Sequence, residues 1–259
     1  MVILKSPEEI EKMRISGRIV AEVLNELRKY VQVDITTFEL EKVAADEIYK
    51  RGGEPTFKGY RRYANDNAFP SCICASINEE VVHGIPTSRK LRKGDILSID
   101  VGVKAEGFCS DAAITVPVDG IRNDVARLLR VTEEALYRGI DETYEGNRLQ
   151  DISHAIQRHV EENNFSVIRD FVGHGIGRSP HEDPQVPNYG KPGLGRRLEE
   201  GMVLAIEPMV SMGSYEVEIL NNNWTAVTRD SSLSAHFEHT VAITSKGPEI
   251  LSVIHKEMK

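Results

Sequence analysis

The sequence has few cysteines, no long apolar run and no excess of basic residues. Its three cysteines are an odd number, and Cys72 and Cys74 stand too close together to suggest a disulfide framework. No stretch is long and apolar enough to span a bilayer, and the first ten residues lack the features of a signal peptide. The net charge of −8 argues weakly against a nucleic-acid-binding surface, and it leaves room for a local basic patch. These absences predict a reduced, cytoplasmic protein that does not cross a membrane, and they give no sign of nucleic-acid binding.

Two stretches of the chain repeat one pattern. Residues 91–102 read LRKGDILSIDVG, and residues 198–209 read LEEGMVLAIEPM. When their leucines are aligned, Asp100 falls on Glu207. Each copy places a carboxylate within a run of β-prone apolar residues, where a buried charge is costly unless it is paired or binds a metal.

A second acid follows each copy of the repeat. Asp111 precedes the apolar run AAITVPV, and Glu238 precedes HTVAIT. Taken alone, each acid has an ordinary alternative role, because a strand aspartate can cap a turn or pair with an arginine. Four acids in two matched pairs instead predict one cation site shared by both halves of the chain, and with one imidazole they form a donor set for two divalent ions.

The candidate imidazole is His174 in DFVGHGIGR, because glycines on both sides allow backbone and metal to approach closely. His181 follows seven positions later, and His83 ends the apolar run in VVHGIP. Three histidines at strand-to-loop junctions predict a cleft. Four other histidines are interpreted as structural or solvated: His154, His159, His236 and His239. His236 remains a weak candidate for a place behind the metal ligands, because it is two residues from Glu238.

Helix and strand signals occur twice in the same order. Helices are expected at residues 6–27, 38–53, 123–140 and 149–160. Strands are expected at residues 72–82, 95–103, 108–118, 166–172 and 238–244 and in the second repeat, with a loop at 173–195 and a hairpin around 221–232. This order predicts an α+β fold with two pseudosymmetric halves, about residues 1–120 and 121–259, around a central sheet. Residues 1–259 should form a single catalytic domain, because the carboxylates of both halves must meet.

Several motifs together resemble those of the methionine aminopeptidases: VVHGIP, IDVG, FCSDAAITV, GHGIGRSPHEDPQV, LAIEPM and FEHTV. They span nearly the whole chain in the family's order. The chain carries no basic or zinc-finger extension before its first helix and no large helical insertion between Glu207 and Glu238, so it looks like the short bacterial form of the type I enzymes. The resemblance implies the pita-bread (creatinase/aminopeptidase) fold, with two αβ halves around a central antiparallel sheet.

The resemblance implies a dinuclear metal site with five ligands: Asp100, Asp111, His174, Glu207 and Glu238. By this resemblance Asp111 and Glu238 bridge the two ions, Asp100 binds one ion, and His174 with Glu207 binds the other. The ions would be two divalent cations, namely Co, Mn, Fe(II) or Zn.

The implied reaction is removal of the N-terminal methionine from nascent proteins and peptides by a metal-bridged water or hydroxide. The resemblance gives Glu207 the role of proton shuttle, His181 that of stabilising the carbonyl oxygen, and His83 a hydrogen bond to the substrate near the scissile amide. It further implies a monomer that works on peptide N-termini with transient proximity to the ribosome.

Four residues are expected to form the wall of the methionine pocket: Phe69, Cys74, Met209 and Trp224. A soft, aromatic-lined cavity suits a thioether, although the same residues would also suit plain core. The chain departs from the family pattern at Pro180, where phenylalanine is common, and at Asp66, where an aromatic residue is usual. These departures concern the width of the pocket and the tolerated second residue of the substrate.

Two other functions are compatible with the same fold. Aminopeptidase P and prolidase, which hydrolyse Xaa-Pro bonds, share the ligand set, but they usually carry a sizeable additional N-terminal domain that is not present in this sequence. Non-catalytic peptide-binding modules of the fold typically lose metal ligands, whereas all five are present here.

Overall fold

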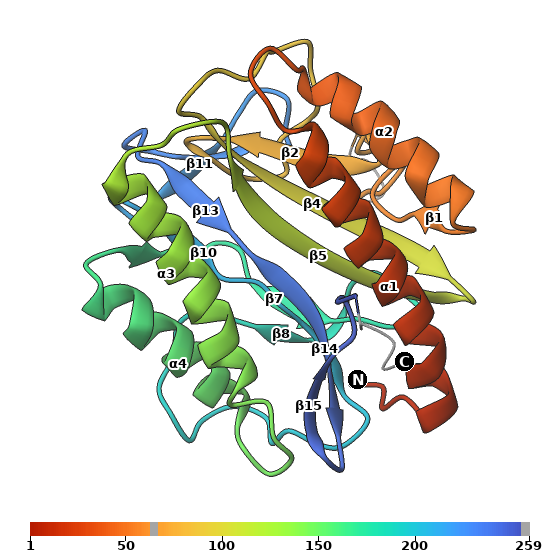
Figure 1. Ribbon diagram of the computed structural model, residues 1–259. Helices are drawn as coiled ribbons and strands as arrows, with labels where there is room; N and C mark the ends of the chain where they lie inside the picture. The colour runs from red at the N-terminus through yellow and green to blue at the C-terminus, as the bar shows by residue number, and fades with distance from the viewer. Residues whose placement is uncertain (63–66, 255–259) are drawn as a thin grey trace, which may run out of the picture.

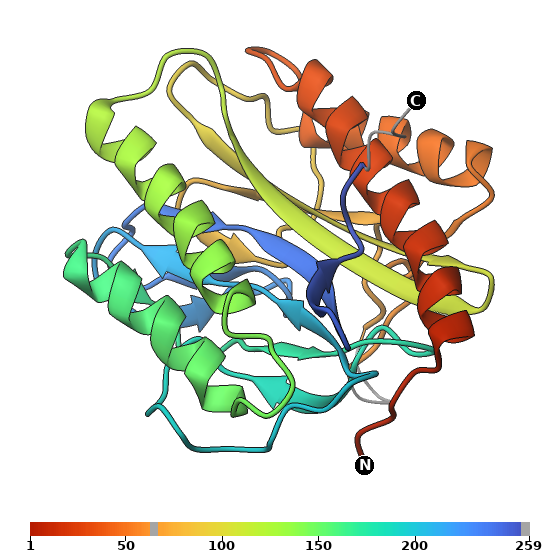
Figure 2. The same cartoon turned by 60° about the horizontal axis from the view of Figure 1, so that its bottom comes forward.

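The structure is a computed structural model that describes residues 1–62 and 67–254. Four helices cover a curved antiparallel sheet, two on each half, as both ribbon views show (Figure 1, Figure 2). The helices are α1 (Pro7–Tyr30), α2 (Thr37–Lys50), α3 (Asn123–Ile140) and α4 (Leu149–Glu162). They agree in number and order with the sequence prediction.

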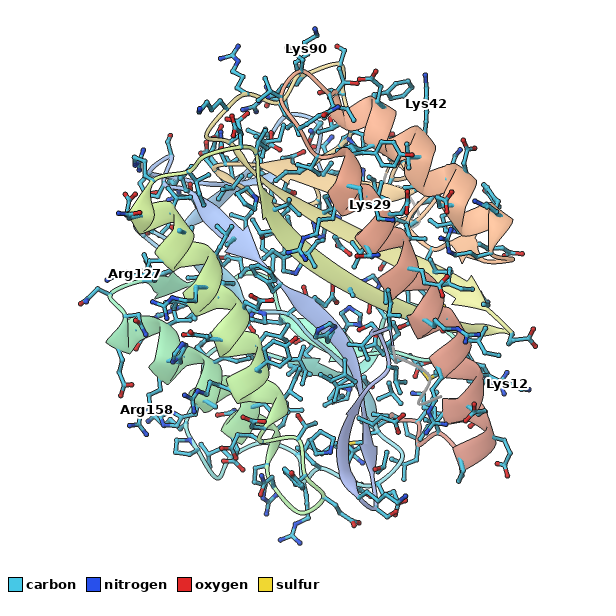
Figure 3. All side chains as sticks on the ribbon, in the orientation of Figure 1. Lys12, Lys29, Lys42, Lys90, Arg127 and Arg158 are labelled. Atoms are coloured by element: carbon cyan, nitrogen blue, oxygen red, sulfur yellow. The ribbon has the colours of Figure 1, made fainter. Side chains whose placement is uncertain are left out.

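The first two helices begin where their capping residues predict. The Ser6 hydroxyl accepts a hydrogen bond from the Glu9 amide at 3.3 Å, and the Glu9 carboxylate accepts one from the Ser6 amide at 3.0 Å. Thr36 and Glu39 form the same reciprocal cap at the start of α2. These bonds satisfy helix-end amides that would otherwise lack partners. The labelled basic side chains of all four helices, such as Lys12 on α1, point away from the sheet (Figure 3).

The main sheet has nine strands in the order β1-β4-β5-β14-β9-β7-β8, with β2 also paired to β4 and β15 to β14. Its strands are β1 (Glu54–Pro55), β2 (Ile73–Ile77), β4 (Ile96–Ala105), β5 (Phe108–Pro117), β7 (Gly173–Gly175), β8 (Glu182–Val186), β9 (Val203–Ile206), β14 (Glu238–Thr244) and β15 (Gly247–Ile250). Two three-stranded sheets are formed by β3 (Glu80–Val82), β6 (Ser166–Val167), β10 (Met209–Ser211), β11 (Val217–Ile219), β12 (Ala226–Thr228) and β13 (Ser234–His236).

Each half of the sheet has its own hydrophobic core. Leu24 of α1 and Leu40 of α2 pack in one cluster with Leu97 of β4. Leu128 of α3 packs in the other cluster with Leu204 of β9. Each fully buried leucine contributes about 1.5–3 kcal/mol. The halves join where β5 pairs with β14, so the predicted αβ halves share one continuous antiparallel sheet.

Two strand predictions were wrong. The strand expected at residues 166–172 is limited to β6, and the expected loop at 173–195 contains β7 and β8. The sequence Gly-His-Gly of β7 carries no apolar run, and it is extended because it pairs with β9 on one side and β8 on the other. Sheet pairing therefore overrides the local signal here.

Among the residues described, none of the helices combines the length and apolar character needed to cross a bilayer.

Candidate metal centre and substrate cleft

Strand register brings the predicted acids together. Asp100 on β4 lies opposite Ala113 on β5, and Ala113 lies opposite Glu238 on β14. Ile99 and Val101 belong to the core beneath α1 and α2. Since side chains alternate along a strand, Asp100 points to the opposite face. A row of three neighbouring strands thus places Asp100 and Glu238 on either side of a small alanine.

The remaining candidate ligands reach the same place from β5, β9 and β7. Asp111 precedes Ala113 by two residues and shares its face of β5. Glu207 follows β9 directly, and His174 lies at the centre of β7 opposite Ala205 of β9, not at the end of a longer strand as expected. A Cβ at Gly173 would lie 2.3 Å from the Ala205 carbonyl oxygen, so the glycine there allows the two strands to approach.

The ligand atoms lie within metal-binding range of one another. One oxygen or nitrogen atom each from Asp111, His174 and Glu238 all lie within 4.8 Å of one another. His174 Nε2 is 3.5 Å from Glu207 Oε1 and 3.7 Å from Asp111 Oδ2. His174 Nδ1 is 2.9 Å from the Gly175 carbonyl oxygen, which can only accept. Nδ1 therefore carries the proton, and the Nε2 lone pair of the neutral ring faces the acids.

Burial and mutual repulsion oppose ionisation of all four carboxyl groups. Burial raises the pKa of Asp111 to about 6, and burial together with neighbouring carboxylates raises the pKa of Asp100, Glu207 and Glu238 well above the usual range. Asp100 Oδ1 is buried without a hydrogen-bond partner among the described residues. Divalent cations would compensate the charge of the ionised carboxylates and would be coordinated by the Asp100 oxygen that lacks a partner. The donor set therefore fits a hard or borderline divalent metal.

A cavity of about 790 Å³ opens onto these acids. Its wall includes all five candidate ligands and five further residues predicted from the sequence: Phe69, Cys74, His83, His181 and Trp224. His181 lies at the exposed side of the cavity, with its ring centroid 4.4 Å from that of His174 and 4.9 Å from that of Tyr60. The predicted histidine-lined cleft and the predicted metal site are therefore one space.

His83 adopts an unusual backbone conformation in the cavity wall. Its φ of 60° lies in the left-handed region, which costs a residue other than glycine about 1–3 kcal/mol. The next residue, Gly84, accepts a hydrogen bond from the Ala75 amide at 2.8 Å, which helps to hold this conformation. Burial, and then the positive charge of Arg62, lowers the pKa of His83 to about 4. The ring is therefore neutral at physiological pH and can both donate and accept.

The apolar end of the cavity is built from three of the four predicted pocket residues. The Phe69 and Trp224 rings meet edge to face with centroids 5.2 Å apart, and both cluster with Cys74. Met209, the fourth, is not among the residues that line the cavity. Its side chain is fully buried in a neighbouring cluster that includes Val82 of β3, because β10 pairs with β13 and β6 behind the cavity.

The two departures from the family pattern have different outcomes. Pro180 is half-buried directly before His181, in the turn that leads into β8. Asp66 lies outside the described residues.

Further residues of the site were not identified from the sequence, and Tyr60, Thr240 and Asn188 are examples. Tyr60 contacts the His181 ring, and the aromatic content of residues 54–70 was the only signal for it. The Thr240 hydroxyl accepts a hydrogen bond from the Asp111 amide at 3.0 Å, and Asn188 Nδ2 donates one to the Glu207 carbonyl at 2.9 Å. Threonine in a strand and asparagine in a loop are too common to mark a site.

The histidines interpreted as structural fall into two groups. His236 Nε2 is buried 3.6 Å from Glu207 Oε2 and has no hydrogen-bond partner within the described part of the chain, so it does lie behind a candidate ligand. His239 Nδ1 is 2.9 Å from the Ser252 hydroxyl. His159 Nε2 is 3.0 Å from Glu134 Oε2 between α4 and α3, so it is more than a solvated residue.

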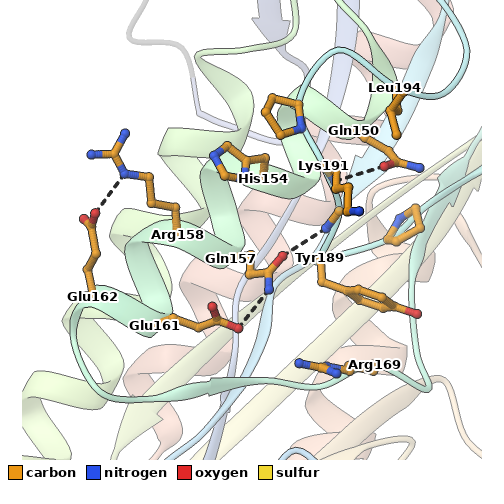
Figure 4. Close-up of a pocket in the computed structure, with 13 residues that line it drawn as sticks. Gln150, His154, Gln157, Arg158, Glu161, Glu162, Arg169, Tyr189, Lys191 and Leu194 are labelled. Atoms are coloured by element: carbon orange, nitrogen blue, oxygen red, sulfur yellow. Dashed lines mark hydrogen bonds and ion pairs between the residues drawn. The ribbon is translucent and has the colours of Figure 1, made fainter.

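A second hollow of about 790 Å³ lies between α4 and residues 187–194 (Figure 4). His154 is part of its wall, and the two glutamines of the wall have hydrogen-bond partners. Gln157 accepts a hydrogen bond from the Gly190 amide at 3.0 Å and donates one to Glu161 at 2.9 Å. Gln150 accepts one from the Lys191 amide at 3.0 Å. These bonds attach the loop to α4, and among the described residues no candidate metal-binding group lies in this hollow.

The sequence and the fold were compared with those of known proteins. A sequence model described as "Metallopeptidase family M24" matches residues 11–245. A methionine aminopeptidase of Clostridium perfringens is 54% identical over 254 residues, which cover 98% of this chain and 100% of that protein. The crystal structure of methionine aminopeptidase from Thermotoga maritima superposes with a TM-score of 0.94 at 47% identity and covers 98% of this chain and 100% of its own.

A more distant likeness is confined to the fold. Prolidase from Pyrococcus furiosus superposes with a TM-score of 0.78 at 19% identity, and the match covers 98% of this chain but 66% of the prolidase chain. The pita-bread architecture expected from the sequence is thereby confirmed.

Proposed function

The chain belongs to metallopeptidase family M24, and on that premise we propose that it removes the N-terminal methionine from peptides and nascent proteins. One observation carries the proposal. Four carboxylate side chains and one imidazole line the same cavity of about 790 Å³ as an apolar, aromatic cluster. An exopeptidase for methionine needs both features, since the substrate presents an α-amino group and a thioether side chain to the same site.

We propose that the site binds two divalent cations. Asp111 and Glu238 would bridge them, Asp100 would bind one ion, and His174 with Glu207 would bind the other. This assignment is supported by the spacing of the ligand atoms and by the open Asp100 oxygen. When bound, such ions supply a nucleophilic water at neutral pH and polarise the scissile carbonyl. The donor set allows Mn, Fe(II), Co or Zn, and its excess of carboxylates favours the harder ions among them.

The protein's own residues would then move and hold the protons. Glu207 would take a proton from the attacking water at its carboxylate and pass it to the leaving amine, which is general base and then general acid catalysis. Its 3.5 Å approach to His174 holds Glu207 among the candidate ligands. His181 would donate a hydrogen bond to the carbonyl oxygen as negative charge develops there. His83 would bond the substrate near the scissile amide.

Specificity would follow from the two ends of the cavity. The free α-ammonium of the substrate would pair with the acidic end, which limits cleavage to the first peptide bond. The methionine side chain would lie against Phe69, Cys74 and Trp224. Met209 would support this wall from the neighbouring cluster.

The remaining features of the proposal concern the whole molecule. Residues 1–259 would act as one catalytic domain, because the ligands come from both halves of one sheet. We propose a monomer that works in the cytoplasm near ribosomes, where its substrates emerge. The described cysteines Cys72, Cys74 and Cys109 are buried free thiols, which suits a reducing compartment.

The decisive test is a metal titration of the stripped protein with three peptides. Met-Ala-Ser, Leu-Ala-Ser and an Xaa-Pro peptide would be assayed with Mn, Co and Fe(II). Metal-dependent release of free methionine, with little cleavage of the other two, is the expected result. Cleavage of only the Xaa-Pro peptide would assign the chain to the prolidase branch. Tight metal binding without cleavage of any peptide would favour a non-catalytic binding module.

A further inference from the structure

The beginning of the chain lies beside the loop that carries His181. Residues 2–6 precede α1 on the side of the molecule that Figure 2 brings forward. The Lys5 amide donates a hydrogen bond to the Gly201 carbonyl at 2.7 Å, which fixes this segment next to the start of β9. Its side chain points to residues 176–182, the connection between β7 and β8.

Lys5 and Glu182 form a buried ion pair across 177 residues of sequence. Lys5 Nζ is 2.6 Å from Glu182 Oε2, and the two side chains are only 3% and 8% exposed. Lys5 Nζ also donates a hydrogen bond to the Ile3 carbonyl at 3.0 Å. A lysine is seldom this deeply buried, and an ammonium without its carboxylate there would be strongly unfavourable. Neutral contacts would be enough to attach the first residues of the chain to the rest of the fold, so attachment alone does not explain a buried charged pair.

The same carboxylate organises the turn that carries His181. Glu182 Oε1 accepts a hydrogen bond from the Ser179 amide at 3.2 Å, so this bond closes the turn of residues 179–182 that contains His181. A Cβ at Gly177 would lie 2.4 Å from Lys5 Cε, which means that the lysine stem occupies the space left by that glycine. The Lys5 side chain is thus built into the turn.

The His181 ring needs such support. Its recorded neighbours are the rings of His174 and Tyr60, and within residues 1–62 and 67–254 no hydrogen bond fixes its orientation. Glu182, the next residue, lines the same cavity. A histidine that must meet a developing negative charge loses much of its effect when its position shifts by about 1 Å.

We propose that Lys5 is a positioning residue for catalysis: by holding Glu182, it fixes the turn that presents His181 to the substrate carbonyl. This inference rests on the proposed function, because it presupposes the role given to His181. It adds a contribution from the chain's first residues to a site whose other parts come from the sheet and its loops.

The test is a double-mutant cycle between Lys5 and His181. Lys5→Met keeps the length of the stem and removes the charge, and it should lower kcat for Met-Ala-Ser by roughly 10- to 100-fold with KM changed less than about twofold. In the His181→Ala background the same substitution should change kcat less than about twofold, because the group that it positions is absent. Equal losses in both backgrounds would overturn the proposal and leave Lys5 a structural role.

A matched control comes from a second ion pair of the same region. Arg14 of α1 pairs with Glu249 of β15, with Nε to Oε1 at 2.7 Å, and has no recorded contact with the turn of His181 in the described residues. Arg14→Met should leave kcat unchanged within about twofold. If Lys5→Met folds poorly, the neutral pair Lys5→Met with Glu182→Gln removes both charges and must still lower kcat. Wild-type kcat in that variant would also overturn the proposal.

A spectroscopic measurement separates this proposal from the proposed function. In metal-free protein labelled with ¹⁵N-histidine, the His181 ring signals are assigned by their loss in His181→Ala. They should move in Lys5→Met and stay in place in Arg14→Met. If the wild-type protein releases no methionine while these signals move, the proposed function fails and the coupling of Lys5 to His181 stands. Unmoved signals would refute that coupling.

Discussion

Two hollows of the molecule have the same volume, about 790 Å³ each, and opposite chemistry. In the hollow beside α4, Gln150 and Gln157 satisfy the amides of the facing loop. In the hollow between the sheet halves, Asp100 and His83 each retain a buried polar atom without a hydrogen-bond partner among the described residues. Size therefore does not distinguish the functional site here. The site is distinguished by buried polar groups whose partners must come from outside the chain.

The two hollows also differ in what positions their residues. The glutamines of the second hollow lie on one helix, whereas the acids of the first come from three strands and from the residue that follows a fourth, in two halves of the chain. Burial raises the pKa of all four acids, and neighbouring carboxylates raise those of Asp100, Glu207 and Glu238 further, so ionisation of the cluster is unfavourable in the absence of a cation. Such an arrangement persists in a fold when a ligand compensates for it.

The largest effect is expected from Glu207→Gln in the first hollow. Gln keeps an oxygen for the metal but cannot shuttle a proton, so kcat should fall by roughly 10³-fold. The free energy of unfolding of the metal-free protein should stay the same or rise, because burial and the neighbouring carboxylates oppose ionisation of Glu207 and glutamine cannot ionise. Methionine release and thermal unfolding of the same samples check both parts. An unchanged kcat would remove the proton-shuttle assignment.

The first hollow was also the more predictable of the two from the sequence. A carboxylate inside an apolar segment is unfavourable unless it has a partner, and this pattern occurs twice, at Asp100 and at Glu207. The repetition allowed the site to be recognised from the sequence. The helix caps at Ser6 and Thr36 are local signals of the same kind. Fold class, the four helices and the β4–β5 hairpin were accordingly predictable.

What could not be predicted depends on distant partners. Strand β7 is extended only because β9 and β8 flank it, and its three residues carry no strand signal. The position of Met209 behind the cavity follows from the pairing of β10 with two other strands. Lys5 and Glu182 meet across 177 residues, and neither residue is unusual where it stands in the sequence. No pattern within one element contains such information.

The next largest effect should follow removal of the metal. The folded-state pKa of Asp111 is raised to about 6, so the stability associated with its neutral form is present at low pH and is lost as pH rises through that value. The other three acids extend the loss to higher pH. Bound cations oppose it, by about 2.7 kcal/mol at a free concentration of 100 Kd. The difference in Tm between metal-loaded and chelated protein should therefore widen from pH 5 to pH 8. A constant difference would argue against a cation at these acids.

A smaller effect is expected at the apolar end of the same hollow. Trp224→Phe leaves a gap beside Phe69, so kcat/KM for Met-Ala-Ser should fall by roughly tenfold, with a smaller change for Leu-Ala-Ser. Phe165→Leu, in the core beneath α3 and α4, is the control and should alter stability without changing the ratio of the two rates. An unchanged ratio in Trp224→Phe would show that this wall does not select methionine.

The smallest effect is expected in the second hollow, beside α4. Gln157→Ala removes the acceptor for the Gly190 amide and should lower the free energy of unfolding by about 1 kcal/mol. Amide exchange of residues 190–193 should accelerate, because the loop loses one of its attachments to α4. Methionine release should stay within about twofold of wild type, and Gln150→Ala should behave alike because it holds the next amide of that loop. A tenfold loss of activity in either variant would mean that the hollow beside α4 takes part in catalysis, and that matched hydrogen bonds do not distinguish a structural hollow from a functional one.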